Sequence, residues 1–132
     1  MIIGVPCETD PHETRSALSP ASVAKLVKLG ATVRFEAGIG RHCRWSDQTF
    51  ASAGATVADR GTILAESDLV LRVRKPALDE VGRMKAGAWQ ISFMDPFNDH
   101  ALVRALAGAK VNAVSMEMIP RSTRAQKMDA LS

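Results

Sequence analysis

Two hydrophobic patterns alternate along this chain, and their order restricts the fold more than any other feature of the sequence. Apolar runs typical of strands occupy residues 1–5, 31–37, 55–57, 69–73, 88–93 and 111–116. Segments with helical spacing lie between them, at residues 20–29, 47–53, 60–65, 80–84 and 100–106. Strands that alternate with helices form right-handed βαβ units. The sequence therefore predicts an α/β fold with three layers, of the Rossmann or flavodoxin type, in which helices cover both faces of a mainly parallel sheet.

The clearest boundary signals surround the first helix. Ser19 and Pro20 are the residue types preferred at the N-cap and at the first helical position, and Gly30 follows the last apolar residue. At the other end, residues 120–132 are predicted as a loop followed by a helix, and the sequence stops inside that helix. We therefore expect residues 1–132 to be a single domain that is one piece of a larger protein.

Composition excludes several classes of protein. The 132 residues are 46% hydrophobic, which suits one globular domain, and no apolar run is long enough to span a bilayer. The 17 basic and 14 acidic residues are interspersed, so no nucleic-acid partner is predicted. Two cysteines and three scattered histidines fit neither a disulfide scaffold nor a metal site. A reduced, cytoplasmic environment is the simplest interpretation.

The pair Gly38 and Gly40 follows a predicted strand, as the dinucleotide-binding fingerprint does. That fingerprint requires a third glycine three positions after the second, where this chain has Cys43. We therefore favour a plain turn over a phosphate-binding loop, and a complete nucleotide site is absent from the sequence.

Several polar residues follow predicted strands, where ligands gather in open α/β sheets. The segment 72–75 contains three basic residues, Arg72, Arg74 and Lys75. They suit a ligand site or a solvated strand edge equally well. Arg15 could hold a carboxylate or phosphate, or could attach its loop to Glu8 or Glu13. Asp95 is a functional acid or a turn residue.

Three other residues are predicted to be structural. Trp89 alternates within a strand and is expected in the core. Cys7 and Cys43 stand beside no clear base, so buried or half-buried side chains are expected there rather than reactive thiols.

The most unusual segment is the polar run from residue 121 to residue 132. It offers donors and acceptors suited to amide and ribose hydroxyl groups rather than to proton transfer. From the pattern alone we favour the other interpretation, a solvated helix with incidental charges. The polar residues of this run include Arg121, Arg124, Gln126, Asp129 and Ser132.

Several motifs together resemble one known family over nearly the whole length of the chain. The N-terminal part includes Gly4-Val5-Pro6, Glu13-Thr14-Arg15 and Glu36-Ala37-Gly38; further matches are Asp68-Leu69-Val70-Leu71, Ile91-Ser92-Phe93 and Asp95-Pro96. The most specific part is the C-terminal run Arg124-Ala125-Gln126, Met128-Asp129-Ala130-Leu131-Ser132. In these motifs the chain resembles the N-terminal domain of the alanine dehydrogenase and pyridine nucleotide transhydrogenase family.

The two branches of that family differ at positions that bear on chemistry. The alanine dehydrogenase branch has a lysine and a histidine, both used on pyruvate or alanine, where this chain has Arg74 and Asp95. The C-terminal run belongs to the transhydrogenase branch. The resemblance therefore favours the NAD(H)-binding alpha subunit of a proton-translocating NAD(P) transhydrogenase. An alanine dehydrogenase-type domain and a standalone, non-enzymatic binding module remain the alternatives.

The resemblance implies hydride transfer between NAD(H) on this component and NADP(H) on a partner component, coupled to proton movement. It implies that Arg121, Arg124, Gln126, Asp129 and Ser132 bind the cofactor, with Arg121, Gln126, Asp129 and Ser132 near the nicotinamide. The implied partners are a separate Rossmann domain or second alpha polypeptide, the NADP(H)-binding and membrane components, and a second copy in a homodimer. This chain would be cytoplasmic and peripheral to the inner membrane, which it would meet through its complex. No catalytic residue is assigned, because hydride passes between two cofactors without a general base.

Overall fold

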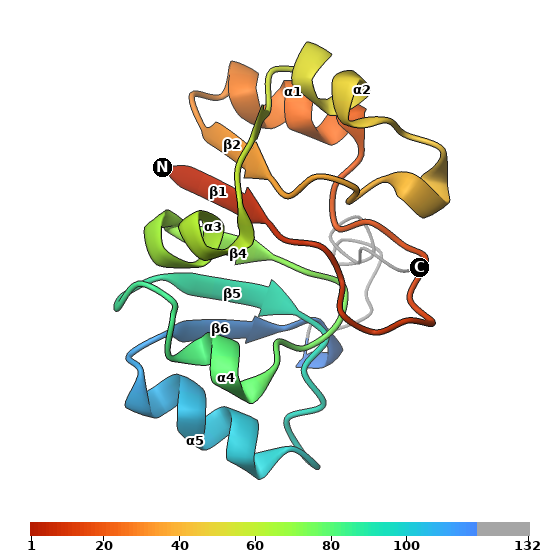
Figure 1. The fold of residues 1–132 in the computed structure, drawn as a ribbon. Coiled ribbons are helices and arrows are strands. Elements are labelled where there is room, and N and C mark those ends of the chain that lie inside the picture. Colours follow the sequence, from red (N-terminus) through yellow and green to blue (C-terminus); the bar gives the residue numbers. More distant parts are fainter. Residues whose placement is uncertain (119–132) are drawn as a thin grey trace.

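Six parallel strands form the centre of the computed structural model, which describes residues 1–118 (Figure 1). Their order across the sheet is β3-β2-β1-β4-β5-β6. The strands are β1 (Ile2–Val5), β2 (Thr32–Phe35), β3 (Thr56–Val57), β4 (Leu69–Leu71), β5 (Trp89–Ser92) and β6 (Asn112–Ser115). Every pairing is parallel, which confirms the predicted sheet.

Five α-helices connect these strands within the described part of the chain. They are α1 (Pro20–Lys28), α2 (Asp47–Ser52), α3 (Arg60–Glu66), α4 (Leu78–Val81) and α5 (His100–Gly108). Two short 3-10 helices, η1 (Arg41–Cys43) and η2 (Met116–Met118), follow β2 and β6. The predicted loop and helix at residues 120–132 lie outside the described residues.

The helices cover opposite faces of the sheet. One apolar cluster joins Val23 of α1 and Phe50 of α2 to β1 and β2, and a second joins α3, α4 and α5 to Val70 of β4. Leu71, the next residue of β4, packs against the first cluster. Because neighbouring residues of a strand point to opposite faces, the two clusters lie on the two sides of the sheet.

The topological switch point of the sheet lies between β1 and β4, and the region between the loops that follow these two strands is called the crevice here. The chain leaves β1 toward β2 on one side, whereas it leaves β4 toward β5 on the other. The loops after these two neighbouring strands therefore diverge, and ligands of open α/β sheets bind at such a point.

Predicted boundaries hold where a side chain caps the helix. Ser19 accepts a hydrogen bond from the backbone N–H of Ser22 at 3.1 Å, and Gly30 has a φ of 98° after α1. The end of α5 differs from the prediction, which placed it at Leu106. The helix continues through Gly108, because Lys110, with a φ of 59°, adopts the left-handed conformation that ends it.

Trp89 does not belong to the core, contrary to the prediction. Its side chain begins β5 and is 46% exposed. On its face of β5 and β6 the sheet carries no helix among the described residues, since α4 and α5 pack on the other face. Strand alternation predicts which residues share a face, but not whether that face is covered.

The two glycines after β2 have structural explanations that need no ligand. Gly38 donates its N–H to the Asp47 carboxylate at 2.8 Å. A Cβ at Gly40 would lie 2.6 Å from the Phe50 ring and 2.7 Å from the Trp45 carbonyl oxygen. Gly40 is therefore required by packing, and residues 37–40 form a turn, as predicted.

We expect Gly40→Ala to lower the free energy of unfolding by about 1–3 kcal/mol, because the added methyl group overpacks a closed site. The control is Gly82→Ala, where a Cβ would meet nothing within 4 Å. That change should alter stability by less than about 1 kcal/mol. Urea denaturation of both variants checks this, and equal effects would contradict it.

Candidate functional site

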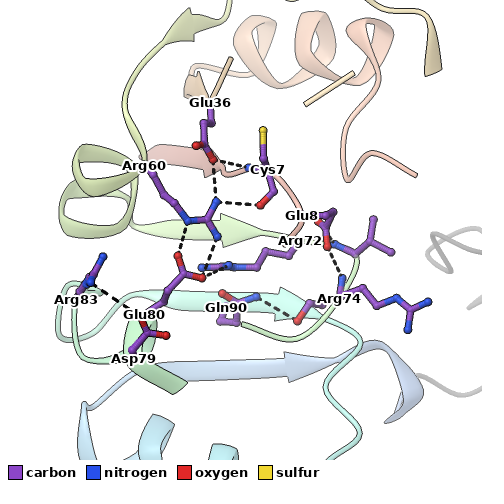
Figure 2. Close-up of polar contacts among 12 residues, drawn as sticks. Cys7, Glu8, Glu36, Arg60, Arg72, Arg74, Asp79, Glu80, Arg83 and Gln90 are labelled. Carbon is purple, nitrogen blue, oxygen red and sulfur yellow. Dashed lines mark hydrogen bonds and ion pairs between the residues drawn. The ribbon is translucent and has the colours of Figure 1, made fainter. Parts of the chain in front are cut away.

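Glu8 connects the loops on the two sides of the crevice. Its carboxylate accepts the backbone N–H groups of Val73 and Arg74, both at 2.9 Å, from the segment that follows β4 (Figure 2). Glu8 itself lies in the loop that follows β1. One carboxylate therefore accepts two backbone N–H groups that follow the end of β4 and would otherwise lack a partner.

A buried carboxylate fixes two arginines at this edge of the sheet. Glu13, whose side chain is 2% exposed, accepts two hydrogen bonds from the Arg15 guanidinium, at 2.7 and 2.8 Å. Arg74 Nε donates to the same carboxylate at 2.9 Å. The side chains of Arg15 and Arg74 remain about half exposed. The interpretation that Arg15 attaches its loop to Glu13 is confirmed, and the guanidinium still faces solvent.

The hydrogen bonds from Arg15, with that from Arg74, lower the pKa of Glu13 to about 2 despite its burial. Glu13 is therefore ionised at neutral pH, and Asp10, whose Oδ2 lies 3.9 Å from Arg74 Nε, supplies a second negative charge, so the two arginines are balanced by two carboxylates. The half-exposed guanidiniums of Arg15 and Arg74 still offer donors that suit a carboxylate or a phosphate group.

A second carboxylate, Glu80 of α4, joins two arginines below the crevice (Figure 2). Arg60 of α3 donates to it through Nε and Nη2, and Arg72 donates through Nη1 at 2.9 Å. Burial alone would raise the pKa of Glu80, but its bonds with the two guanidiniums lower the pKa below the ordinary value. The carboxylate therefore stays ionised between them.

Arg60 extends this cluster to the loop after β1. Its Nη1 donates to the Cys7 carbonyl oxygen at 2.9 Å and to Glu36 at 2.8 Å, and Glu36 accepts the Cys7 N–H at 2.8 Å. The backbone of Cys7 is thus held at both its donor and its acceptor. Arg60, Arg72, Glu36 and Glu80 carry two positive and two negative charges, so the set is neutral.

Arg72 is neither a ligand group nor a solvated strand edge, the two alternatives that the sequence left open. Its side chain is 3% exposed and paired with Glu80, which lies eight residues further along the chain. Burial lowers the pKa of its guanidinium, and Glu80 opposes that shift. The Nε and Nη2 atoms of Arg72 and the Oε1 atom of Gln90 are buried without a partner among the described residues.

Asp95 is a turn residue. It has a φ of 51°, its carboxylate accepts a bond from Asn98 at 2.8 Å, and its N–H donates to Glu117 at 2.8 Å. Lys75 pairs with Asp99 at 2.7 Å. Neither Asp95 nor Lys75 therefore joins the arginine pair on Glu13.

The cysteines are structural, as predicted. Burial, with the neighbouring Glu36 charge, raises the pKa of the Cys7 thiol to about 11, so it is protonated at neutral pH. Cys43 is half-buried, with its Sγ 3.5 Å from the Thr14 carbonyl oxygen. Residues 1–118 contain no cluster of three groups able to hold a metal ion.

The N-termini of the four longest described α-helices offer no free site for a pyrophosphate, and only the four-residue helix α4 begins without a side-chain cap. Ser19, Ser46, Asp59 and Asp99 cap α1, α2, α3 and α5 with their own side chains. The carboxylates among these caps would also repel a phosphate. The predicted cofactor contacts at Arg121, Arg124, Gln126, Asp129 and Ser132 lie outside the described residues.

Glu80 and Arg60 are the important residues that sequence reasoning missed. Nothing in the sequence indicates that a glutamate in a four-residue helix forms an ion pair with an arginine at the start of another helix. The one available indication was the position of Arg72, which alternates with Val70 and so had to point to the same buried face.

Fold and site together define an α/β domain in which carboxylates fix two half-exposed arginines beside the topological switch point of the sheet. Comparison with known proteins places it in a family: the description "Alanine dehydrogenase/PNT, N-terminal domain" matches residues 4–132. The chain belongs to this family as its N-terminal domain, and the predicted resemblance is confirmed.

Three relatives illustrate the match. The NAD(P) transhydrogenase subunit alpha of Haemophilus influenzae is 37% identical over all of this chain and 26% of its own length. The transhydrogenase structure from Sinorhizobium meliloti has a TM-score of 0.93 and 40% identity, covering 99% of this chain and 39% of that one. An L-alanine dehydrogenase structure has a TM-score of 0.86 and 29% identity, and the match covers 94% of this chain and 34% of that one. The chain thus spans a quarter to two-fifths of these relatives, and it matches the N-terminal domain of transhydrogenase alpha subunits.

In the described part of the chain, no helix is both long and apolar enough to cross a membrane.

Glu80→Gln should lower the free energy of unfolding by about 3–5 kcal/mol, because it leaves Arg72 buried without a counter-charge. Glu66→Gln is the matched control, since Glu66 pairs with Arg34 while 54% exposed. An exposed pair contributes at most about 1 kcal/mol. Urea denaturation at neutral pH compares the two, and a similar loss in both would contradict the assigned role of Glu80.

Glu13 should contribute to acid unfolding. Its folded pKa of about 2 lies below the ordinary value of 4.5, so its stabilising effect is complete above about pH 4.5. The effect is lost as the pH falls from there toward 2. Glu13→Gln should therefore lower stability at pH 7 and flatten the decline between pH 5 and 3. Asp79→Asn, at a 73% exposed position, is the control and should leave the profile unchanged.

Proposed function

We propose that this chain is the N-terminal part of the NAD(H)-binding alpha subunit of a proton-translocating NAD(P) transhydrogenase. The observation that carries the proposal is the similarity to transhydrogenase alpha subunits over the whole chain, at 37% and 40% identity. The C-terminal run that contains Gln126 and Asp129 supports it, because this run resembles the transhydrogenase branch.

The chemistry of the described edge agrees with hydride transfer. NAD(H), when bound, would supply or accept the hydride, with NADP(H) on a partner component. Glu8 and Glu13 are engaged by backbone N–H groups or guanidiniums, and the pKa of Glu13 is lowered. A lowered pKa makes a carboxylate a weak base, whereas direct transfer between two nicotinamides requires alignment and no proton acceptor.

The alternative, an alanine dehydrogenase-type domain, needs groups that act on an amino acid and its oxo acid. The resemblance assigns those roles to a lysine and a histidine, and this chain has Arg74 and Asp95 there. Arg74 is bonded to Glu13, and the Asp95 carboxylate accepts a bond from Asn98. This arrangement supports the transhydrogenase branch.

Within this proposal, residues 1–118 hold one side of the cofactor site and fix it through the ion pairs of Glu13 and Glu80. Arg121, Arg124, Gln126, Asp129 and Ser132 would bind the nicotinamide end of NAD(H). A Rossmann domain in the remainder of the alpha subunit, or on a second alpha polypeptide, would bind the pyrophosphate. The partners would be the NADP(H)-binding and membrane components.

Residues 1–132 alone should bind NADH weakly, because the N-termini of the four longest described α-helices are capped by their own side chains. Calorimetric titration of the chain with NADH measures this. Micromolar affinity would contradict the division of the site between this chain and a separate domain.

In the assembled enzyme, Gln126→Asn, Asp129→Asn and Arg121→Ala should each slow hydride transfer by up to about a hundredfold. A displacement of about an ångström between reacting groups has an effect of this size. Single-turnover transfer is measured beside a thermal melt, and the melting temperature should change little. Lys127→Gln, in the same run but outside the proposed contacts, is the control. Wild-type rates in all three variants would identify the run as a solvated helix.

A further inference from the structure

A single carboxylate joins the ends of β5 and β6 at the carboxyl edge of the sheet. Glu117, which follows β6, accepts the backbone N–H groups of Met94 at 3.0 Å and of Asp95 at 2.8 Å, both from the loop after β5. It also accepts the hydroxyl of Ser115, the last residue of β6. The last pair of the two strands is Ser92 with Ser115, so Glu117 continues their connection beyond the end of the sheet.

The loop bound by Glu117 contains an unfavourable backbone conformation. Asp95 has a φ of 51°, in the left-handed region that few residues other than glycine adopt. Its N–H donates to Glu117, its carbonyl oxygen accepts the N–H of Asp99 at 2.9 Å, and its carboxylate accepts the Asn98 side chain at 2.8 Å. Such a conformation persists only where surrounding contacts fix it, so Glu117 helps to determine the path of this loop.

Glu117 and Glu8 make the same kind of contact at different strand ends. Glu8, after β1, accepts two successive N–H groups that follow β4, and Glu117 accepts two that follow β5. Between them, the N–H of Phe93 donates to the Val73 carbonyl oxygen at 3.0 Å and joins the ends of β4 and β5. The ends of β1, β4, β5 and β6 are therefore connected in one series, from the crevice to the point where the chain leaves β6.

The charge of Glu117 serves these contacts. Desolvation alone would raise the pKa of Glu117, but the bonds from Ser115, Met94 and Asp95 lower the pKa below its ordinary value. No ion pair within residues 1–118 includes Glu117. An ionised carboxylate has acceptor sites for all three donors and binds them more strongly than a neutral amide would.

We propose that Glu117 is a positioning residue for hydride transfer: it fixes the point at which the chain leaves the sheet and thereby limits where Arg121 can lie. This role rests on the proposed function, which assigns Arg121 to the nicotinamide end of NAD(H). Arg121 follows Glu117 by four residues, a separation that spans at most about 14 Å, whereas the nine residues to Gln126 span up to about 32 Å. Of the proposed cofactor contacts, Arg121 therefore depends most on Glu117.

Single-turnover hydride transfer in the assembled enzyme tests this role. Glu117→Gln replaces one acceptor with an NH2 group that opposes a backbone N–H. It should slow transfer by at least about fivefold, since a displacement of about an ångström has an effect of up to about a hundredfold. The affinity for NADH should change little, because a contact that only aligns the reacting groups acts on the rate rather than on binding.

Glu66→Gln is the matched control for this measurement. Glu66 is the last residue of α3, is 54% exposed, and precedes β4, so it lies toward the amino edge of the sheet. This variant should transfer hydride at the wild-type rate.

A double-mutant cycle separates positioning from general support of the fold. In the Arg121→Ala background, Glu117→Gln should slow transfer by less than about a further twofold, because both changes act on the same contact. Two effects that simply multiply would show that Glu117 does not act through Arg121, and would overturn the proposal.

Hydrogen exchange of residues 1–132 measures the contact itself, independently of activity. The amides of Met94 and Asp95 should exchange faster in Glu117→Gln than in Glu66→Gln, because they lose a charged acceptor. Equal exchange in the two variants would also overturn the proposal.

The failure of this role and the failure of the proposed function give different results. An assembled wild-type enzyme that transfers no hydride from NADPH would contradict the proposed function, and the role of Glu117 with it. If the wild-type enzyme transfers hydride and Arg121→Ala slows it, a wild-type rate in Glu117→Gln would overturn the role of Glu117 alone.

Discussion

The buried carboxylate of Glu80, held between Arg60 and Arg72, is the interaction on which the arrangement of the crevice depends. It connects α4 to the start of α3 and to the end of β4, three segments that pack from different parts of the chain. A guanidinium as buried as Arg72 is strongly unfavourable without a counter-charge, so these segments are stable only together. Through Arg60 the same cluster holds both backbone groups of Cys7, where the loop after β1 begins.

The arginines at the surface of the crevice depend on this buried cluster. Glu8 binds the backbone after β4, and Glu13 binds Arg15 and Arg74, so the loop that starts at Cys7 is fixed at three successive points. A loop of this length would otherwise be mobile, and a mobile loop could not support the alignment that hydride transfer demands. The chain contributes rigidity and fixed charge here, and the ionised Glu13 is too weak a base to contribute proton transfer.

The sequence predicted the architecture well because the strands and helix caps are local signals. Ser19 acts on Ser22, three positions away, and caps α1 as predicted. The pairing of Arg15 with Glu13, two residues apart, was also predicted as one alternative. The same local reasoning placed the turn at Gly38 and Gly40 correctly.

What the sequence could not predict is contact between distant segments. Arg72 contacts Glu80 only because α4 folds back over the end of β4. Arg60, at the start of the crossover helix between β3 and β4, contacts Glu36, which lies 24 residues earlier in the chain. Trp89 was placed in the core because alternation cannot tell a covered face of a sheet from an uncovered one. The apolar groove between α5 and β6 is likewise a place where no other described element packs, and the sequence does not indicate that.

The most direct test of the account compares two activities of the assembled enzyme that contains this chain. One is the reduction of an NAD analogue by NADPH, and the other is the reduction of NAD by L-alanine. The account predicts the first activity and no appreciable second one. Alanine-dependent reduction without transfer from NADPH would contradict it.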